Sequence, residues 1–298
     1  MGRWAKKRAK EKSKSLKNQV YDKTLKMYQD GQGRSKFQDK KDGLSGRFIY
    51  SSSTFQTYKK EGKLFCTWIE KEHPEVRQLK DAEQYVNSYL EYLIKEDFSP
   101  WSISTKKAAL SKIFQVPAGT FMDTPTRERA KIKRSRYESS LDKNISKETE
   151  NYYSKITSAT GLRRAELLKI TGDSLYEKDG KYFIRVEKGT KGGRPRVAEI
   201  IGKDDAETQE IVNLFREKGK LRVVSSVPKH LDNHYYRGQY AKKVYNRYAR
   251  PEDYIPQDKK YVMRKDRAGE VLDRDAMLIT SRYLGHNRVD VIAQSYLY

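Results

Sequence analysis

The clearest pattern of apolar and polar positions lies between residues 52 and 116, where apolar side chains recur at helical spacing. A first predicted helix carries them on one face, at Phe55, Tyr58, Phe65, Trp68 and Ile69. The spacing of Asp81 and Gln84 predicts a capping box at the start of a second helix, and Ser99 followed by Pro100 predicts the start of a third. We therefore expect a compact helical domain whose aromatic side chains pack mainly in its core.

The second half of the chain combines helical and strand patterns. Residues 181–186 and 196–201 flank a turn rich in Gly and Lys, which predicts a β-hairpin. Residues 261–273 predict two further short strands around a turn, whereas a helical pattern begins near residue 147. The expected fold is mainly α: a helical amino-terminal domain, then a mixed, mostly α domain with a small antiparallel β-sheet.

Charge and composition restrict the class of partner. The 298 residues include 63 Lys and Arg against 40 Asp and Glu, which gives a net charge of +23. Such an excess is typical of proteins that bind nucleic acid, although a ribosomal or membrane-surface protein would share it. The single cysteine, Cys66, excludes a disulfide framework and a Cys-rich zinc site, and it fits a buried position in a helix. No apolar run reaches the ~20 residues that cross a bilayer, so we expect a soluble intracellular protein.

Three short segments indicate the chemistry. They are residues 160–167 (Thr-Gly-Leu-Arg-Arg-Ala-Glu-Leu), 234–237 (His-Tyr-Tyr-Arg) and 284–286 (Leu-Gly-His), the last followed after ten residues by Tyr296. Each alone is a weak signal, because short patterns with Arg, His or Gly occur by chance. In this order they resemble the catalytic boxes of the tyrosine recombinase (phage integrase) family. The resemblance covers residues 52–298, with its specific motifs in the second half.

The resemblance implies a role for each matching residue. Arg163 and Arg237 are expected to clamp a DNA phosphate, because a planar guanidinium donates two parallel hydrogen bonds and remains charged. His234, one helical turn before Arg237, is expected to donate or transfer a proton, and His286 to donate a further hydrogen bond to the phosphate. The family often has a further helix after the box tyrosine, and the given sequence has none. Either the chain is trimmed at this end or assembly relies on other surfaces, which leaves open how protomers would communicate.

The first box contains two adjacent arginines. A helix turns by about 100° per residue, so Arg163 and Arg164 cannot face one phosphate equally, and the spacing to Glu166 favours Arg163. Glu166 is expected to orient the site. The remaining histidines, His73 and His230, are assigned to packing or the surface.

The turn of the predicted hairpin, residues 188–194, resembles the family's hairpin with a catalytic lysine. Lys191 matches better than Lys188 and is expected to be the general acid for the leaving 5′ oxygen. Lys188 remains the alternative, and Lys188 and Arg194 are expected to contact DNA. The expected nucleophile is Tyr296, because Tyr298 is the final residue and less rigidly held.

These assignments divide the chain into four parts. We predict a basic amino-terminal arm (1–46), a helical core-binding DNA domain (47–120), a basic interdomain linker (121–145) and a catalytic domain (146–298). Residues 1–40 contain 13 basic and 4 acidic residues, which fits either a disordered tail or an arm that follows DNA phosphates. The linker cations expected to contact DNA are Arg127, Arg129, Lys131, Lys133, Arg134 and Arg136.

The resemblance implies a site-specific DNA recombinase, an integrase of a mobile element, that works through a covalent 3′-phosphotyrosine and a Holliday junction without cofactor or metal. Its implied partners are double-stranded DNA and further copies of the chain, in a tetramer, with a directionality factor left open. It would lie in the bacterial cytoplasm with the nucleoid, away from membranes. Two alternatives remain: a non-catalytic architectural DNA-binding protein, and a topoisomerase-like nicking and resealing enzyme. The stretch between Arg237 and His286 is longer than in compact family members, and residues 261–273 within it could extend the DNA footprint, contact a partner or be ornamental.

Overall fold

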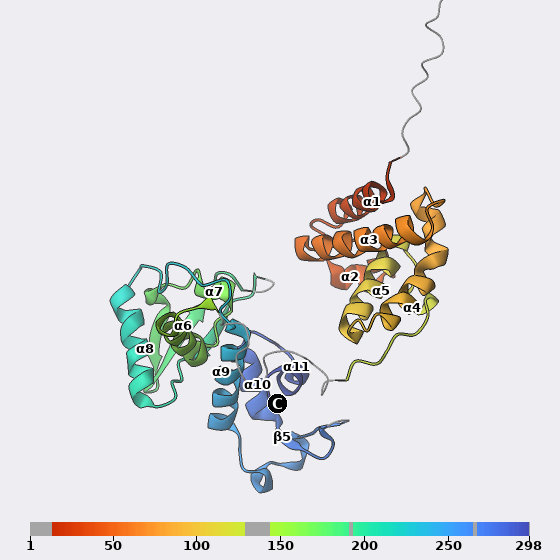
Figure 1. Ribbon diagram of the computed structural model, residues 1–298. Coiled ribbons are helices and arrows are strands. Elements are labelled where there is room, and N and C mark those ends of the chain that lie inside the picture. Colours follow the sequence, from red (N-terminus) through yellow and green to blue (C-terminus); the bar gives the residue numbers. More distant parts are fainter. Residues whose placement is uncertain (1–13, 129–143, 191–192, 265–266, 298) are drawn as a thin grey trace, which may run out of the picture. The chain divides into compact units, whose positions relative to one another are not determined.

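A computed structural model describes residues 14–128, 144–190, 193–264 and 267–297. The chain divides into two compact units, Met1–Glu128 and Arg129–Tyr298 (Figure 1). The fold class is as predicted, mainly α with small antiparallel sheets. None of the described helices combines the length and the apolar character needed to cross a membrane.

The first unit is built from helices around an apolar core. They are α1 (Leu16–Asp30), α2 (Lys36–Lys41), α3 (Ser52–Glu72), α4 (Val86–Lys95) and α5 (Pro100–Phe114), with 3₁₀ helices η1 (Ser45–Arg47), η2 (Leu79–Tyr85) and η3 (Ala118–Thr120). The three helices predicted between residues 52 and 116 correspond to α3, α4 and α5. Phe65 is fully buried, with its ring against those of Tyr89 and Phe114. Burial also raises the pKa of the Cys66 thiol to about 12, so this cysteine acts as a small apolar residue.

Two helix starts test the capping signals. Ser99 caps α5 as predicted, because its Oγ accepts a hydrogen bond from the Ser102 amide, and Pro100 takes the first helical position. The capping box predicted at Asp81 and Gln84 is wrong. Both residues lie inside η2, where Gln84 Nε2 donates to the Asp81 carbonyl at 3.0 Å, and α4 begins only at Val86. Here the burial of apolar residues on η2 determines the local geometry, overriding the polar pattern.

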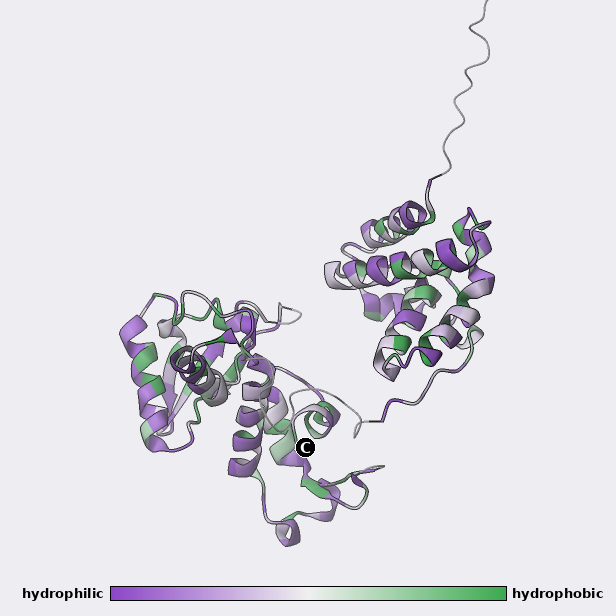
Figure 2. Cartoon of the chain, in the orientation of Figure 1, coloured by the Kyte–Doolittle hydropathy of each residue, from purple (hydrophilic) through white to green (hydrophobic). Residues whose placement is uncertain are grey.

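The arm predicted for residues 1–46 needs a correction. Between residues 16 and 41 it contains α1 and α2, and α1 packs against α3. Leu16, Val20 and Met27 of α1 are buried because they lie at i, i+4 and i+11, on one face of the helix. The many lysines of this stretch obscured that apolar face. Figure 2 shows the same mixture along most helices of both units, with hydrophilic and hydrophobic residues on each.

The second unit combines helices with two small sheets. Its helices are α6 (Lys147–Thr160), α7 (Arg164–Leu167), α8 (Asp205–Lys218), α9 (Asn233–Tyr248), α10 (Arg274–Tyr283) and α11 (Val289–Ser295), with 3₁₀ helices η6 (Gly172–Ser174), η8 (Glu252–Tyr254) and η9 (Gln257–Lys259). Helix α9 lies against both α6 and α10 (Figure 1). The strands are β1 (Leu175–Lys178), β2 (Lys181–Val186), β3 (Arg196–Glu199), β4 (Lys260–Val262) and β5 (Val271–Asp273).

Both predicted hairpins are present. Strands β2 and β3 pair antiparallel, with Ile184 opposite Ala198, and β4 pairs antiparallel with β5. The first sheet also contains β1, which pairs with β2. The sequence did not predict β1, because its four residues are of mixed polarity. Strand β3 ends at Glu199, before the predicted residue 201, because the Ile201 amide donates at 2.9 Å to the carbonyl of Ala159 in α6. The chain thereby leaves the sheet and crosses to the helix that precedes the first box.

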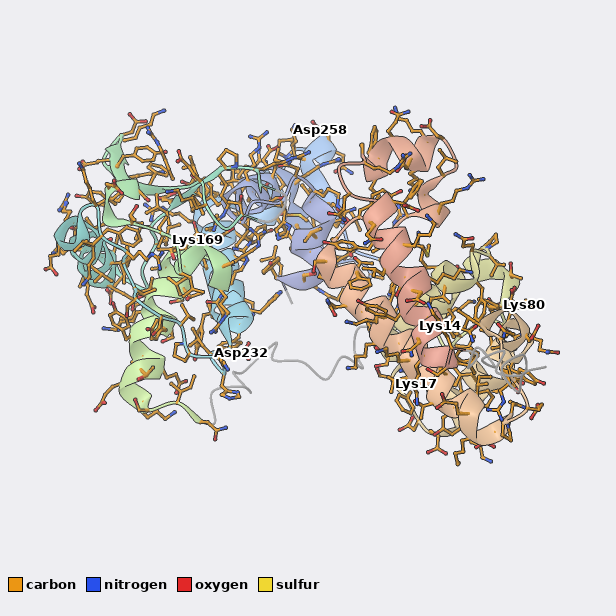
Figure 3. The ribbon with its side chains drawn as sticks, turned by 90° about the horizontal axis from the view of Figure 1, so that it is seen from above. Lys14, Lys17, Lys80, Lys169, Asp232 and Asp258 are labelled. Atoms are coloured by element: carbon orange, nitrogen blue, oxygen red, sulfur yellow. The ribbon has the colours of Figure 1, made fainter. Side chains whose placement is uncertain are left out.

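Many charged side chains are exposed on each unit. Figure 3 draws the side chains as sticks around both ribbons and labels the exposed Lys80 on the first unit and the exposed Lys169 on the second. Arg127 is exposed as well. The other predicted linker cations, Arg129, Lys131, Lys133, Arg134 and Arg136, lie outside the described residues.

Candidate active site

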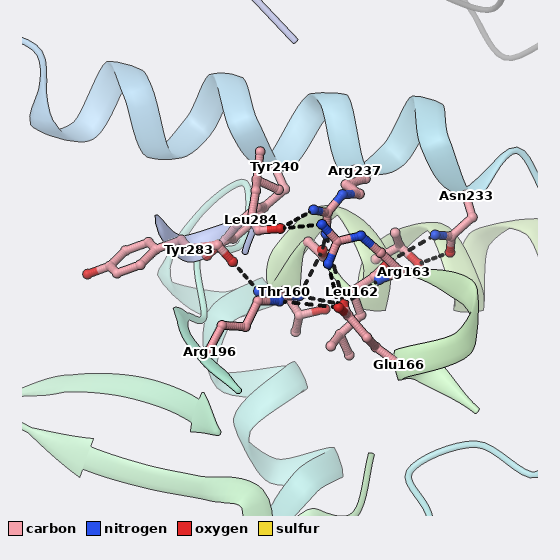
Figure 4. A network of polar contacts seen from close by, with 12 residues as sticks. Thr160, Leu162, Arg163, Glu166, Arg196, Asn233, Arg237, Tyr240, Tyr283 and Leu284 are labelled. Carbon is pink, nitrogen blue, oxygen red and sulfur yellow. Dashed lines mark hydrogen bonds and ion pairs between the residues drawn. The ribbon is translucent and has the colours of Figure 1, made fainter. Parts of the chain in front are cut away.

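The three boxes converge on two backbone carbonyl groups. Helix α6 is capped by Gly161, whose left-handed conformation turns the chain directly into Arg163 and α7. Helix α9 presents Arg237, whose buried guanidinium donates hydrogen bonds to the carbonyls of Gly161 and Leu284. Arg163 Nη2 donates to the same Leu284 carbonyl at 2.9 Å. Figure 4 shows these side chains pointing toward one another from separate elements.

Glu166 holds the arginine of the first box. Its Oε1 accepts a hydrogen bond from Arg163 Nη1 at 2.6 Å, and its Oε2 accepts one from the Arg163 amide at 2.8 Å. Burial alone would raise the pKa of Glu166, but the charge and hydrogen bond of Arg196, helped by Arg163 and Arg237, lower it to about 2. The side chain is therefore a carboxylate at neutral pH. Its two hydrogen bonds hold Arg163 in place.

Arg196 is a member of this cluster that the sequence analysis did not assign to the site. Its Nη2 lies 2.7 Å from Glu166 Oε2 and donates to the Gly161 carbonyl at 3.2 Å, while Nη1 donates to the Tyr283 carbonyl. Its side chain is 3% exposed. A signal was available, because Arg196 lies two residues before the buried Ala198 and so shares its side of β3. A charged residue on the core side of a strand requires a buried partner.

Gly285 is required at this point of the chain. It adopts φ 68°, and a Cβ there would lie 2.7 Å from Arg196 Cδ and 3.3 Å from Arg163 Nη1. Any larger residue would therefore push against two of the clustered arginines. The Gly of the third box thus allows the turn before His286 to lie directly on the arginine cluster.

The tyrosine of the third box reaches the same place. The Tyr296 hydroxyl lies 3.3 Å from Arg237 Nε, which donates to it, and 3.3 Å from His286 Nε2. The ring of Tyr296 stacks on that of His234, with centroids 5.5 Å apart and an interplanar angle of 10°. Tyr296 is buried, and burial lowers the pKa of Arg237 to about 10, which leaves its guanidinium charged at neutral pH. Predicted residues from all three boxes are therefore neighbours.

The structure separates the two adjacent arginines of the first box. Arg164 donates to the carbonyls of Val227 and Pro228, away from the cluster, whereas Arg163 faces Glu166 and Leu284. Arg163 therefore belongs to the cluster, and the predicted choice of Arg163 over Arg164 as the phosphate clamp stays a prediction.

Near the hairpin turn, Gly189 lies directly on α7. A Cβ at Gly189 would approach the Ala165 carbonyl oxygen to 2.3 Å, so the loop after β2 packs on the backbone of the first box. Lys188 and Arg194 are exposed on either side of this turn. Lys191 lies outside the described residues, and so does Tyr298.

The cluster favours a bound anion. Arg163, Arg196 and Arg237 carry three positive charges against the single negative charge of Glu166, an excess of two. Arg163 is the most accessible of the three, with 20% of its side chain exposed. Guanidinium groups held in this way suit a phosphate, which they can bond in pairs. Among the described residues, no group of His, Cys, Asp and Glu is arranged to hold a metal ion.

Comparisons with known proteins identify the fold. No protein-family model matches the chain, and no curated protein matches it. Among solved structures, the XerH site-specific recombinase bound to difH substrate in a pre-cleavage complex is similar over 95% of this chain and 92% of its own, with a TM-score of 0.50 and 13% sequence identity. The Tn1549 transposon integrase (residues 82–397) in complex with circular intermediate DNA covers 96% of both chains, at 11% identity and a TM-score of 0.45. The chain therefore has the fold of this XerH recombinase.

Proposed function

We propose that the protein is a site-specific DNA recombinase that cleaves and rejoins DNA through a covalent 3′-phosphotyrosine intermediate. The observation that carries this proposal is the contact of the Tyr296 hydroxyl with both Arg237 Nε and His286 Nε2, at 3.3 Å each. A tyrosine hydroxyl beside a buried guanidinium and an imidazole has the groups that attack on a phosphodiester requires. The fold that it shares with a DNA-bound recombinase supports the same function.

The reaction requires two changes of bonds at phosphorus and two proton transfers. The Tyr296 oxygen forms a bond to phosphorus as the bond from phosphorus to the 5′ oxygen breaks, and the 5′ oxygen leaves with a proton. His286 was expected to donate to the phosphate, but its Nε2 lies 3.3 Å from the Tyr296 hydroxyl. In the tautomer that leaves Nε2 unprotonated, it can take the phenol proton, and Lys191 supplies the proton to the leaving oxygen. The phosphodiester energy is kept in the phosphotyrosine, so a 5′ hydroxyl can reverse the step on the same or another strand.

The arginines stabilise the transition state. The five-coordinate phosphorus carries two negative charges, which match the two excess positive charges of the cluster. Donors that are oriented before the reaction need no rearrangement when this charge develops. This is the reason to expect cleavage without an added metal ion.

The wider assignments belong to the same proposal. The partner is double-stranded DNA, bound through exposed cations that include Arg127, Lys188 and Arg194. Exchange of strands between two duplexes needs four cleavages, so we expect four protomers and a Holliday junction. A directionality factor remains open, and we place the protein with the DNA in the bacterial cytoplasm.

The test uses randomly nicked genomic DNA, because the target sequence is unknown. The protein is incubated with it in excess EDTA, denatured and digested, and the peptide attached to DNA is identified. We expect an adduct at Tyr296 and a single family of DNA end sequences. The absence of any adduct would favour the alternative of a non-catalytic DNA-binding protein. Strict dependence of cleavage on magnesium would refute the arginine mechanism. Joining of two different duplexes at the trapped sequence separates a recombinase from a topoisomerase-like enzyme.

A further inference from the structure

At the base of the hairpin formed by β4 and β5, hydrogen bonds and an ion pair join it to the rest of the second unit. Arg250 donates to both carboxylate oxygens of Asp273, through Nε and Nη2, at 2.7 Å each. The Tyr245 hydroxyl accepts a hydrogen bond from the Asp273 amide at 2.9 Å. The hydrogen bond from Arg250 lowers the pKa of Asp273 to about 2, so the pair is charged at neutral pH. Leu272 of β5 is buried in the main apolar core.

The other end of the hairpin touches the segment that carries the candidate nucleophile. Arg267 Nη1 donates to the carbonyl of Leu297 and, at 3.3 Å, to that of Ala293. Glu270 holds the opposite edge of the guanidinium, with Oε2 accepting from Nε at 2.6 Å and Oε1 from Nη2. The arginine is thus fixed on the hairpin and bonded to the backbone on both sides of Tyr296.

The segment that receives these bonds is anchored by the buried side chains of Ile292, Tyr296 and Leu297, but its backbone forms only a short helix. Helix α11 has only 7 residues, and Tyr296 leaves it with φ −132° and ψ −37°. The last carbonyls of a helix have no partner within the helix, and a cation there is favourable. Without an external donor, the last turn of such a short helix frays.

We propose that the hairpin holds the backbone around the nucleophile in place and that Arg267 is a positioning residue. By bonding the carbonyls of Ala293 and Leu297, it fixes the backbone on both sides of Tyr296 and so keeps the hydroxyl within reach of Arg237 and His286. The catalytic part of this inference rests on the proposed function, in which Tyr296 is the nucleophile. The backbone part does not depend on any activity.

The backbone part is tested by amide hydrogen exchange on the full-length protein without DNA. The amides of Tyr296 and Leu297 both donate to the Ile292 carbonyl, at 3.1 and 3.0 Å, and report on the end of α11. Arg267→Gln should accelerate their exchange at least tenfold. Arg264→Gln removes the same charge from an exposed position of the same hairpin and should leave exchange unchanged. Unchanged exchange in Arg267→Gln would refute the proposal that the hairpin holds the backbone around Tyr296.

The catalytic part is tested by the rate of adduct formation at saturating DNA. Arg267→Gln should slow it at least tenfold while the apparent Kd for DNA stays within twofold of the parent, and Arg267→Lys should recover part of the rate. Faster exchange with an unchanged cleavage rate would refute the positioning role. An equal loss of DNA affinity in Arg267→Gln and Arg264→Gln would instead make the hairpin a DNA contact. If the parent protein forms no adduct, the proposed function fails. The exchange measurement still tests whether the hairpin holds the backbone around Tyr296.

Discussion

Replacing Arg196 with methionine removes one of the partners that neutralise the buried carboxylate of Glu166. Methionine keeps much of the volume of the side chain and so isolates the loss of charge and hydrogen bonds. Glu166 would retain Arg163, through Nη1 at 2.6 Å and the amide at 2.8 Å, while the Tyr283 carbonyl would lose the Arg196 donor. The change therefore leaves a buried charge only partly compensated.

The size of the effect follows from that geometry. Breaking a buried ion pair by removing one partner costs about 3–5 kcal/mol, and the remaining bonds to Arg163 place this case near the lower end. For a domain of this size, 1 kcal/mol shifts Tm by about 2–4 °C, so we expect Tm of the second unit to fall by about 6–12 °C.

Thermal unfolding followed by circular dichroism measures this shift, and a second variant separates charge from packing. Glu166→Gln added to Arg196→Met removes the uncompensated charge, so the double variant should be more stable than the sum of the two single effects, by at least about 1 kcal/mol. Arg196→Lys keeps the charge but loses the planar guanidinium with its paired donors, so its Tm should lie between those of the parent and Arg196→Met. If the two effects are additive, or if Arg196→Met lowers Tm by less than 2 °C, the electrostatic role of Arg196 is refuted.

Three further outcomes are expected. Tyr296→Phe should abolish the covalent adduct and leave the Kd for DNA nearly unchanged, because phosphate contacts dominate binding, whereas Tyr298→Phe should keep the adduct; an adduct formed by Tyr296→Phe would disprove the assignment. Arg163→Ala should slow cleavage about a hundredfold, whereas Arg164→Ala should slow it far less, and the reverse order in a single-turnover assay would move the clamp to Arg164. Because the pKa of Glu166 is lowered to about 2, the stability it contributes is complete above about pH 4.5 and is lost as the pH falls toward 2; Glu166→Gln should flatten that part of a plot of stability against pH.

Much of the fold could be predicted because its signals are local. The cap of α5 depends on Ser99 and Pro100, which are adjacent, and the β2–β3 hairpin on alternation within a few residues. The order of the three boxes also gave the candidate residues. Where local signals conflicted with packing, packing determined the structure: the apolar face of α1 was hidden among lysines, and η2 replaced the predicted capping box.

The contacts of the site could not be predicted in the same way, because they join distant parts of the chain through the backbone. Arg163 bonds a carbonyl 121 residues away, and Arg237 bonds one 76 residues away. A carbonyl group is present in every residue, so a sequence pattern does not mark the ones that accept. Arg267 was hidden for the same reason, since its bonds to the helix end depend on where the hairpin folds and on no motif.

In the proposed reaction, the same backbone contacts would allow the buried Arg237 to act on a phosphate. A guanidinium has five N–H groups, and Arg237 directs three of its bonds to the Gly161 and Leu284 carbonyls and the Tyr296 hydroxyl. The two carbonyls fix the plane of the group, and therefore the direction in which its charge and its other donors act. Such a donor does not need to reorient as the charge on the phosphorus develops, which is the condition under which electrostatic stabilisation is most effective. Changes that tilt the plane, including those at Arg196 and Gly285, should therefore reduce the rate of cleavage more than the affinity for DNA.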